Sequence, residues 1–258
     1  MTAAGSIPVL EAVSLEKRFG GVHAVAGVSF AVAAGEMLAL IGPNGAGKST
    51  CFNLVNGQLR ADGGEVRLAG APIAGLRPRA IWRLGVGRTF QITATFASMT
   101  VRENVQMALI SHRGGVWSFL GRAADRHREE AEALLAQVGM AGQADRPCGV
   151  LAYGDLKRLE LAIALANDPR LLLMDEPTAG MAPAERTALM ELTRSIVRAR
   201  GLACLFTEHD MDVVFGHADR IIVMNRGRLI AEGTAEEVRA DAAVREVYLG
   251  SGEASGGH

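Results

Sequence analysis

A glycine-rich loop set between an apolar run and a helical stretch is the feature that most restricts the fold. The loop, residues 42–50, follows Met37–Ile41, which is expected to be a buried strand, and leads into a helix expected over 49–56. It matches the pattern G-x-x-x-x-G-K-[ST], whose glycines let backbone N–H groups converge on phosphate oxygens. A glycine-rich turn with an incidental lysine is the alternative, but the strand before the loop and the helix after it favour phosphate binding.

Residues of this loop have expected parts in binding a nucleotide. Lys48 is expected to neutralise the β- and γ-phosphates, and the hydroxyl of Ser49 is expected to ligate Mg²⁺. The dipole of the following helix favours an anion at its N-terminus. The remaining predicted contacts come from Gly42, Asn44, Gly45, Ala46, Gly47 and Thr50.

Two adjacent carboxylates end a second apolar run. Residues 171–174 are Leu-Leu-Leu-Met, and Asp175 and Glu176 follow them directly. Because parallel strands present metal-binding groups at their carboxyl ends, Asp175 is expected to hold Mg²⁺ through water. Glu176 is expected to act as the general base that polarises the attacking water. Strands often end in acidic residues, and Pro177 also suits a simple turn, but the phosphate loop favours the catalytic interpretation.

The composition is that of an ordinary globular protein with no membrane span. Its 27 Lys and Arg nearly balance 28 Asp and Glu, so no global field favours nucleic acid. No apolar run reaches the roughly 18 residues that a span requires, and residues 1–8 lack the regions of a signal peptide. Cys51, Cys148 and Cys204 are odd in number and lack metal-ligand spacing, which favours reduced thiols in a cytosolic protein.

The order of predicted elements is that of an α/β protein with a helical insertion. Strands are expected first, over 9–13, 25–32, 37–41, 64–68 and 86–91. A mostly helical lobe follows over about 92–168, with helices over 100–111, 123–138 and 155–167. Strands and helices then alternate, which predicts a mainly parallel sheet, over 171–174, 184–200, 203–207, 211–215 and 221–225. We expect one domain over 1–250 and a flexible tail over 251–258.

A glycine-bearing pentapeptide opens the last helix before the acidic strand. It is Leu-Ala-Tyr-Gly-Asp, residues 151–155. Placed between the phosphate loop and the acidic strand, it resembles the signature of the ABC (ATP-binding cassette) ATPases, and the resemblance extends over 9–249. This resemblance implies the ABC ATPase fold, with a P-loop NTPase core and an N-terminal antiparallel β subdomain, and hydrolysis of ATP with Mg²⁺. It also implies that ATP held by a different subunit is contacted by Ala152, Tyr153, Gly154 and Asp155.

The same resemblance implies roles for three further residues. Phe19 occupies the position of the aromatic residue that stacks on adenine. Gln91 matches the glutamine that senses Mg²⁺ and the attacking water, and that links the site to a membrane partner. His209 matches the switch histidine that contacts the γ-phosphate. Without the resemblance, core packing of Phe19 and a satisfied histidine at a helix start would be the simpler interpretations.

Two positions depart from the usual pattern of the family. Ala152 stands where the signature usually has Ser, so a hydroxyl to the γ-phosphate is missing, while Gly154 and the following helix amides remain. Ala182 stands where the segment after Glu176 usually ends with Asp. Communication between two ATP sites through this segment is therefore in question.

Several segments resemble one subfamily, the ATPases of bacterial branched-chain amino acid importers. They are residues 87–91 (Gly-Arg-Thr-Phe-Gln), the signature, 176–181 and 248–250. The resemblance implies a peripheral position on the cytoplasmic face of the membrane, two permease subunits and a second ABC ATPase, identical or related. A periplasmic binding protein would deliver the substrate. A urea or amide importer and a lipopolysaccharide exporter are the nearest alternatives.

Functions of other classes lack their expected features. An ABC ATPase of nucleic-acid maintenance or translation would need long coiled coils, zinc cysteines or a second cassette, and the balanced charge disfavours polyanions. A small GTPase or nucleotide kinase would share only the phosphate loop, and no Asn-Lys-x-Asp segment occurs. The sequence therefore predicts transport-coupled ATP hydrolysis by two subunits that close head to tail over two ATP molecules.

Overall fold

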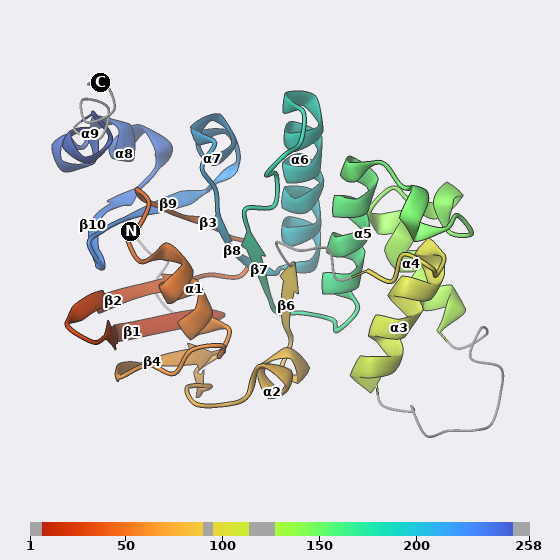
Figure 1. Ribbon diagram of the computed structural model, residues 1–258, viewed down its shortest axis with the longest axis horizontal. Coiled ribbons are helices and arrows are strands. Elements are labelled where there is room, and N and C mark those ends of the chain that lie inside the picture. The colour runs from red at the N-terminus through yellow and green to blue at the C-terminus, as the bar shows by residue number, and fades with distance from the viewer. Residues whose placement is uncertain (1–6, 90–94, 114–126, 250–258) are drawn as a thin grey trace.

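The computed structural model describes residues 7–89, 95–113 and 127–249, which form two sheets and surrounding helices (Figure 1). The first sheet is antiparallel, with the strand order β2-β1-β4-β5. Its strands are β1 (Leu10–Phe19), β2 (Val22–Val32), β4 (Gly63–Leu68) and β5 (Ala71–Pro72). The second sheet has the order β10-β9-β3-β8-β7-β6. Its strands are β3 (Met37–Ile41), β6 (Val86–Thr89), β7 (Leu171–Asp175), β8 (Ala203–Thr207), β9 (Arg220–Asn225) and β10 (Arg228–Gly233).

The second sheet is parallel except for its edge strand β10, which pairs antiparallel with β9. The predicted mainly parallel sheet with an antiparallel N-terminal sheet is therefore confirmed. The helices of the core are α1 (Lys48–Val55), α2 (Pro78–Arg83), α6 (Pro183–Arg200), α7 (Met211–His217), α8 (Ala235–Ala240) and α9 (Ala242–Leu249). Between β6 and β7, the chain forms α3 (Val101–Arg113), α4 (Arg128–Gln137), η2 (Ala141–Gln143), η3 (Cys148–Val150) and α5 (Tyr153–Leu165), and α3, α4 and α5 pack together beside the sheet (Figure 1).

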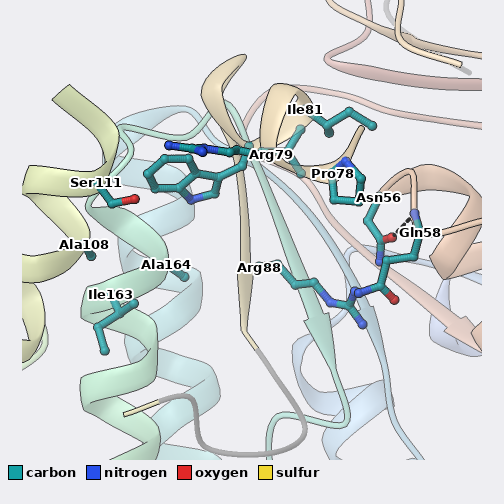
Figure 2. Close-up of a pocket in the computed structure, with 12 residues that line it drawn as sticks. Asn56, Gln58, Pro78, Arg79, Ile81, Arg88, Ala108, Ser111, Ile163 and Ala164 are labelled. Atoms are coloured by element: carbon teal, nitrogen blue, oxygen red, sulfur yellow. Dashed lines mark hydrogen bonds between the residues drawn. The ribbon is translucent and has the colours of Figure 1, made fainter. Parts of the chain in front are cut away.

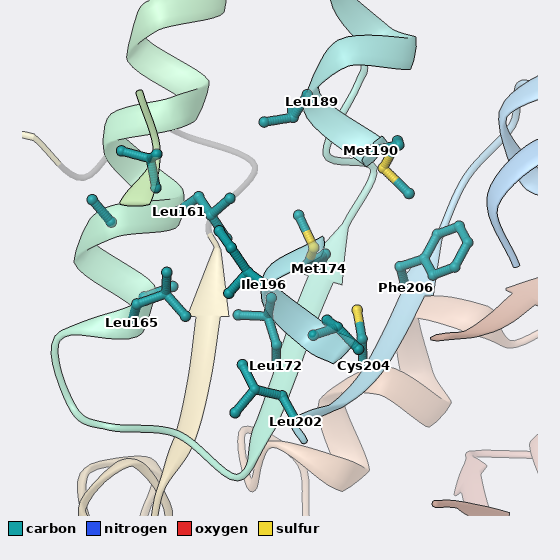
Figure 3. Packing of buried hydrophobic residues seen from close by; sticks show 14 of the residues in the cluster. Leu161, Leu165, Leu172, Met174, Leu189, Met190, Ile196, Leu202, Cys204 and Phe206 are labelled. Carbon is teal, nitrogen blue, oxygen red and sulfur yellow. The ribbon is translucent and has the colours of Figure 1, made fainter. Parts of the chain in front are cut away.

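The two faces of the parallel sheet bury separate clusters of apolar side chains. In β7, Leu172 and Met174 point toward α5 and α6, where they meet Leu161 and Met190 (Figure 3). The alternate β7 residues belong to the other cluster, which fills the space between this sheet, α1 and the first sheet. Because both faces are covered, the strands are continuous apolar runs. The sheet is thus a rigid support for the residues that follow β3 and β7.

The observed strands differ from the predicted ones mainly in the first sheet. The strand predicted over 9–13 continues to Phe19. It passes through a bulge, where Ser14 has a φ of 46° and the pairing register of β1 shifts beyond Ala12. Such a bulge breaks the alternation of apolar and polar residues. The short elements α2, β5, β10, α8 and α9 were not predicted. The end of the strand expected over 86–91, the start of the helix expected over 123–138 and the tail 251–258 lie outside the described residues.

In the part of the chain that the structure describes, no helix has the length and apolar character needed to cross a membrane. The three cysteines are buried free thiols that belong to the two apolar clusters. Burial raises the pKa of Cys51 to about 12. Its thiol therefore stays protonated and packs as a small apolar group.

Candidate active site

The phosphate loop crosses from the end of β3 to the start of α1 and lies against two neighbouring strands. Gly42 has a φ of 150° and Gly47 a φ of 102°, both in the region that favours glycine. A Cβ on Gly42 would lie 2.1 Å from the carbonyl oxygen of Met224, and one on Gly47 would lie 2.2 Å from that of Ala24. Only glycine fits at these two points, so the backbone of the loop is held close to β2 and β9.

Lys48 is buried under this loop, with its ammonium group directed at loop carbonyls. Its Nζ donates to the carbonyl oxygen of Gly42 at 2.7 Å and to that of Pro43 at 3.1 Å. Burial lowers the pKa of Lys48, while the charges of Glu176 and Asp175 act in the opposite direction. The lysine therefore lies between the loop and the two carboxylates that end β7, where it can reach an anionic oxygen.

A polar cleft of about 460 Å³ opens over the loop. Glu176 and His209, which follow the parallel strands β7 and β8 at the same edge of the sheet, line it together with the loop. The predicted phosphate-loop residues from Asn44 to Thr50 all line this cleft, whereas Gly42 is not among its lining residues. Sequence reasoning did not identify the other lining residues, which are Val22, His23, Ala24 and Arg226.

Phe19 is not among the residues that line this cleft. It ends β1 and is 49% exposed, and its ring faces the ammonium group of Lys17 at 5.6 Å. Its pairing partner across the hairpin, Val22, does line the cleft. Phe19 is thus adjacent to the cleft wall rather than part of it.

Asp175 is held at the carboxyl end of β7 by a neighbouring strand. The hydroxyl of Thr207 donates to its Oδ1 at 2.7 Å, and Nη2 of Arg88 lies 4.0 Å from its Oδ2. Burial lowers the pKa of Arg88, and the Asp175 charge opposes this shift. Neither Thr207 nor Arg88 was predicted as a site residue, because their positions follow from the pairing of β6, β7 and β8 and from no sequence motif.

Glu176 has an unusual backbone conformation and a histidine partner. Its φ is 49°, a left-handed value that costs a non-glycine residue on the order of 1–3 kcal/mol. Its N–H donates to the carbonyl oxygen of Thr207 at 3.1 Å, which fixes this turn. Oε1 of Glu176 lies 2.9 Å from Nε2 of His209. The structure therefore brings together the predicted base and the predicted switch histidine, which are 33 residues apart in sequence.

Ser49 and Asp175 provide the donor types that Mg²⁺ prefers, a hydroxyl and a carboxylate oxygen. Among the described residues there is no cluster of three or more His, Cys, Asp or Glu that could hold a metal. The third predicted metal residue, Gln91, lies outside the described residues.

The signature pentapeptide forms a separate small cavity of about 180 Å³ at the start of α5. It is lined by Ala152, Gly154, Asp155, Arg158, Met181 and Glu185, and it shares no lining residue with the cleft over the phosphate loop. Ala152 is the N-cap residue of α5 and makes no side-chain cap. Glu185 accepts a hydrogen bond from the N–H of Ala182 at 3.3 Å. Within one chain, the two groups of predicted nucleotide contacts are therefore apart.

A third cavity, of about 330 Å³, lies between the helical lobe and the sheet. Figure 2 shows Ala108 of α3 and Ile163 of α5 on one side, and Pro78 and Ile81 of α2 above. The ring of Trp82, another lining residue, packs edge-on against His112. Arg88 of β6 also lines this cavity, so the cavity adjoins β6 as well as the helical lobe.

Comparison with known proteins places the chain in a family. The family model described as ABC transporter matches residues 25–179, and the model described as branched-chain amino acid ATP-binding cassette transporter matches 228–254. The high-affinity branched-chain amino acid transport ATP-binding protein LivG of Salmonella typhimurium is 40% identical over 252 residues, 95% of this chain and 99% of that protein. BraF of Pseudomonas aeruginosa, a protein of the same description, is 40% identical over 254 residues, with the same coverage.

Two solved structures are similar over almost the whole chain. The ADP conformation of MJ1267, an ATP-binding cassette of an ABC transporter, has a TM-score of 0.84 and 33% identity, and covers 95% of this chain and 100% of that chain. A nucleotide-free ATP-binding cassette from an ABC transporter has a TM-score of 0.82 and 32% identity, and covers 93% and 98%. The chain belongs to the ABC transporter family of ATPases, in the group of the LivG and BraF ATP-binding proteins.

Proposed function

We propose that this chain powers an importer of branched-chain amino acids, bound at the cytoplasmic face of the membrane to two permease subunits. The match of residues 228–254 to the branched-chain amino acid model, together with the relatives LivG and BraF, supports this substrate class. A second ABC ATPase, identical or related, would complete the ATPase pair. A periplasmic binding protein would present the amino acid, so the ATPase itself would not contact the transported compound.

The separation of the two half-sites is the observation that most directly supports a mechanism with two subunits. The phosphate-loop cleft and the signature cavity share no residue, so one chain offers two incomplete nucleotide sites. A head-to-tail pair would place the signature of one subunit over the phosphate loop of the other. Because Ala152 lacks a hydroxyl, this contact would depend on Gly154 and the N-terminal amides of α5.

In this pair, the loop residues and the carboxyl end of β7 would bind ATP with Mg²⁺. Lys48 would turn its ammonium group from the carbonyls of Gly42 and Pro43 to the phosphates. Ser49 and Asp175 would hold the metal ion, which neutralises phosphate charge when bound. Thr207 would keep Asp175 oriented through its 2.7 Å hydrogen bond. Phe19 would reach adenine from the end of β1.

Glu176 would take a proton from the attacking water. Its carboxylate is 25% exposed and already lies in the cleft wall, so it can reach a water beside a bound γ-phosphate. His209, at 2.9 Å, would hold that carboxylate in place and contact the γ-phosphate. Gln91 would sense Mg²⁺ and the water from the segment that follows β6.

The cavity between the helical lobe and the sheet is the surface we assign to the permease. It is bordered by α2 and β6 on one side and by α3 and α5 on the other, so an inserted permease segment would contact both moving parts. Its apolar members, among them Ile81, Trp82 and Ile163, suit an apolar segment. Closure of the lobe would then reach the membrane subunits through this contact and through Gln91.

Reconstitution with its membrane and binding-protein partners in vesicles tests this function. ATP-dependent uptake of labelled leucine, isoleucine or valine is expected, and uptake should be lost with Glu176→Gln while ATP binding remains. Urea, short amides and lipopolysaccharide should not replace the amino acid, and DNA should not stimulate hydrolysis. Stimulation of ATP hydrolysis by urea or by lipopolysaccharide, without amino acid uptake, would contradict the proposed substrate class but not the ATPase activity.

A further inference from the structure

Tyr153, the third residue of the signature, makes its hydrogen bond within its own chain. Its hydroxyl donates to the carbonyl oxygen of Ala179 at 3.0 Å. The ring lies beside Gly180, where an added Cβ would be 3.6 Å from Cε1 of the ring. Tyr153 does not line the signature cavity, although its neighbours Ala152 and Gly154 do. Its side chain is therefore directed at the segment that follows Glu176.

That segment is tied directly to the general base. The N–H of Ala179 donates to the carbonyl oxygen of Glu176 at 3.2 Å. Thr178 is fixed by Oε1 of Glu208, which accepts from its N–H at 2.9 Å and from its hydroxyl at 2.6 Å. Because Glu176 has a φ of 49°, its conformation depends on the turn that holds it. A displacement of Ala179 would therefore change the backbone conformation of Glu176.

A buried ion pair supports Tyr153 from the side of α5. Nζ of Lys157 lies 3.0 Å from Oε2 of Glu160, and both side chains are almost fully buried. The same Nζ lies 5.4 Å from the centroid of the Tyr153 ring, within the range of a cation–π contact. These two residues have no other part in the proposed hydrolysis. They hold the ring on α5, so it moves with the signature.

We propose that Tyr153 is a positioning residue that couples the signature of each subunit to Glu176 of the same subunit. The proposal rests on the proposed head-to-tail pair. There, the signature contacts the ATP of the partner while Glu176 acts on the ATP of its own subunit. When α5 closes on the partner's ATP, Tyr153 moves Ala179 and thereby changes the position of Glu176. The two ATP sites are thus coupled through one chain, in a protein where Ala182 replaces the usual Asp of this segment.

Steady-state ATP hydrolysis by Tyr153→Phe in the reconstituted complex tests the proposal. The variant keeps the ring and loses only the hydroxyl, so ATP affinity, measured with a fluorescent ATP analogue, should stay within about twofold. The kcat should fall about two- to tenfold, the size expected for one hydrogen bond. Amide exchange of residues 176–182 should become faster, because the Ala179 turn loses its support.

Ser195→Ala is the matched control, since it also removes a hydroxyl that donates to a backbone carbonyl, that of Leu192 at 2.7 Å, within α6. It should change neither kcat nor the exchange of 176–182. A kcat for Tyr153→Phe equal to that of the unmodified protein would overturn the proposal. So would a change confined to ATP affinity, since it would make Tyr153 a direct nucleotide contact. If the unmodified protein itself hydrolysed no ATP, the proposed function would fail instead.

Discussion

At the scale of single residues, Thr207 is the unpredicted residue with most influence on the site. Its hydroxyl donates to Oδ1 of Asp175 at 2.7 Å and lies 3.2 Å from the N–H of Glu176. One side chain thus orients the predicted Mg²⁺ ligand and lies against the predicted base. No sequence pattern marks it, because it depends on the pairing of β7 with β8, in which Asp175 and Thr207 are partners.

Thr207→Val removes this hydroxyl with little change in shape. Groups that orient a metal ligand typically contribute 10- to 100-fold to metal affinity or activity. We expect the Mg²⁺ concentration for half-maximal ATP hydrolysis to rise by about tenfold or more. Thr193→Val, which changes a buried hydroxyl inside α6, is the control and should leave the Mg²⁺ requirement unchanged. An unchanged requirement in Thr207→Val would exclude an orienting role for Thr207.

His217, at the end of α7, gives the protein a predictable sensitivity to acid. Burial lowers its pKa, the charge of Arg194 adds to the shift, and Glu191 opposes it. Below its ordinary value of about 6.5, the unfolded chain therefore binds a proton more readily than the folded protein. The free energy of unfolding must then decrease as the pH falls through this window, and recover as it rises.

Thermal unfolding of His217→Gln across pH 7.5 to 5.5 checks this sign. The unmodified protein should lose more Tm over this range than the variant, by an amount on the order of 2 °C. Glutamine does not bind a proton in this pH range, so the Tm of the variant should change less with pH. Parallel curves for the two proteins would show that His217 does not contribute to acid sensitivity.

At the scale of elements, buried parallel strands were predictable and exposed or irregular ones were not. The expected strands 37–41 and 203–207 agree with β3 and β8 residue for residue. All five residues of each strand are buried, and such strands are recognised in the sequence as nearly continuous apolar runs. β10 has Arg228 and Glu232 in a half-exposed strand, and therefore lacks such a run. The start of α8 could have been predicted from the sequence, because Thr234 and Glu237 form a capping box.

The site could be predicted as far as its motifs extend. The phosphate loop, Asp175 and Glu176 follow from local patterns, whereas His209 follows only from the family resemblance. The structure places Glu176 and His209 2.9 Å apart. The contacts of Thr207, Arg226 and Tyr153 arise only when distant elements pair. Local sequence therefore identifies reactive groups, while the groups that position them depend on tertiary structure.

Tyr248 of helix α9 contacts the phosphate loop. Tyr248 is half-buried against the core, and the backbone of Gly42 hydrogen-bonds to its hydroxyl. Burial raises the pKa of Tyr248, and this hydrogen bond opposes the shift. The segment 228–254, which matches the branched-chain amino acid model, thus reaches the first glycine of the loop.

Tyr248→Phe keeps the packing of α9 and removes this hydroxyl. We expect the KM for ATP to rise about two- to tenfold with a smaller change in kcat, because the loop binds phosphates before the chemical step. Val244→Ala, which loosens the same helix without touching the loop, should lower Tm and leave the KM for ATP nearly unchanged. A lower kcat with an unchanged KM for Tyr248→Phe would contradict this role.

At the scale of the whole molecule, the two proposed half-sites lie on different parts of the fold, one on the parallel sheet and one on the helical lobe. The phosphate loop, Asp175 and Glu176 lie at the ends of parallel strands, whereas the signature lies at the start of α5 in the lobe. The cavity shown in Figure 2 borders both parts. ATP hydrolysis is therefore expected to require two chains that each provide half of a site.

Complementation between two inactive variants tests this claim most directly. Lys48→Met disables the phosphate loop and keeps the signature, and Gly154→Asp places a carboxylate in the signature and keeps the loop. Each variant alone should hydrolyse almost no ATP. When the two are mixed, one intact composite site forms in each mixed pair, so hydrolysis should return and increase with the fraction of mixed pairs. A mixture as inactive as its two components would contradict a site built from two copies of this chain.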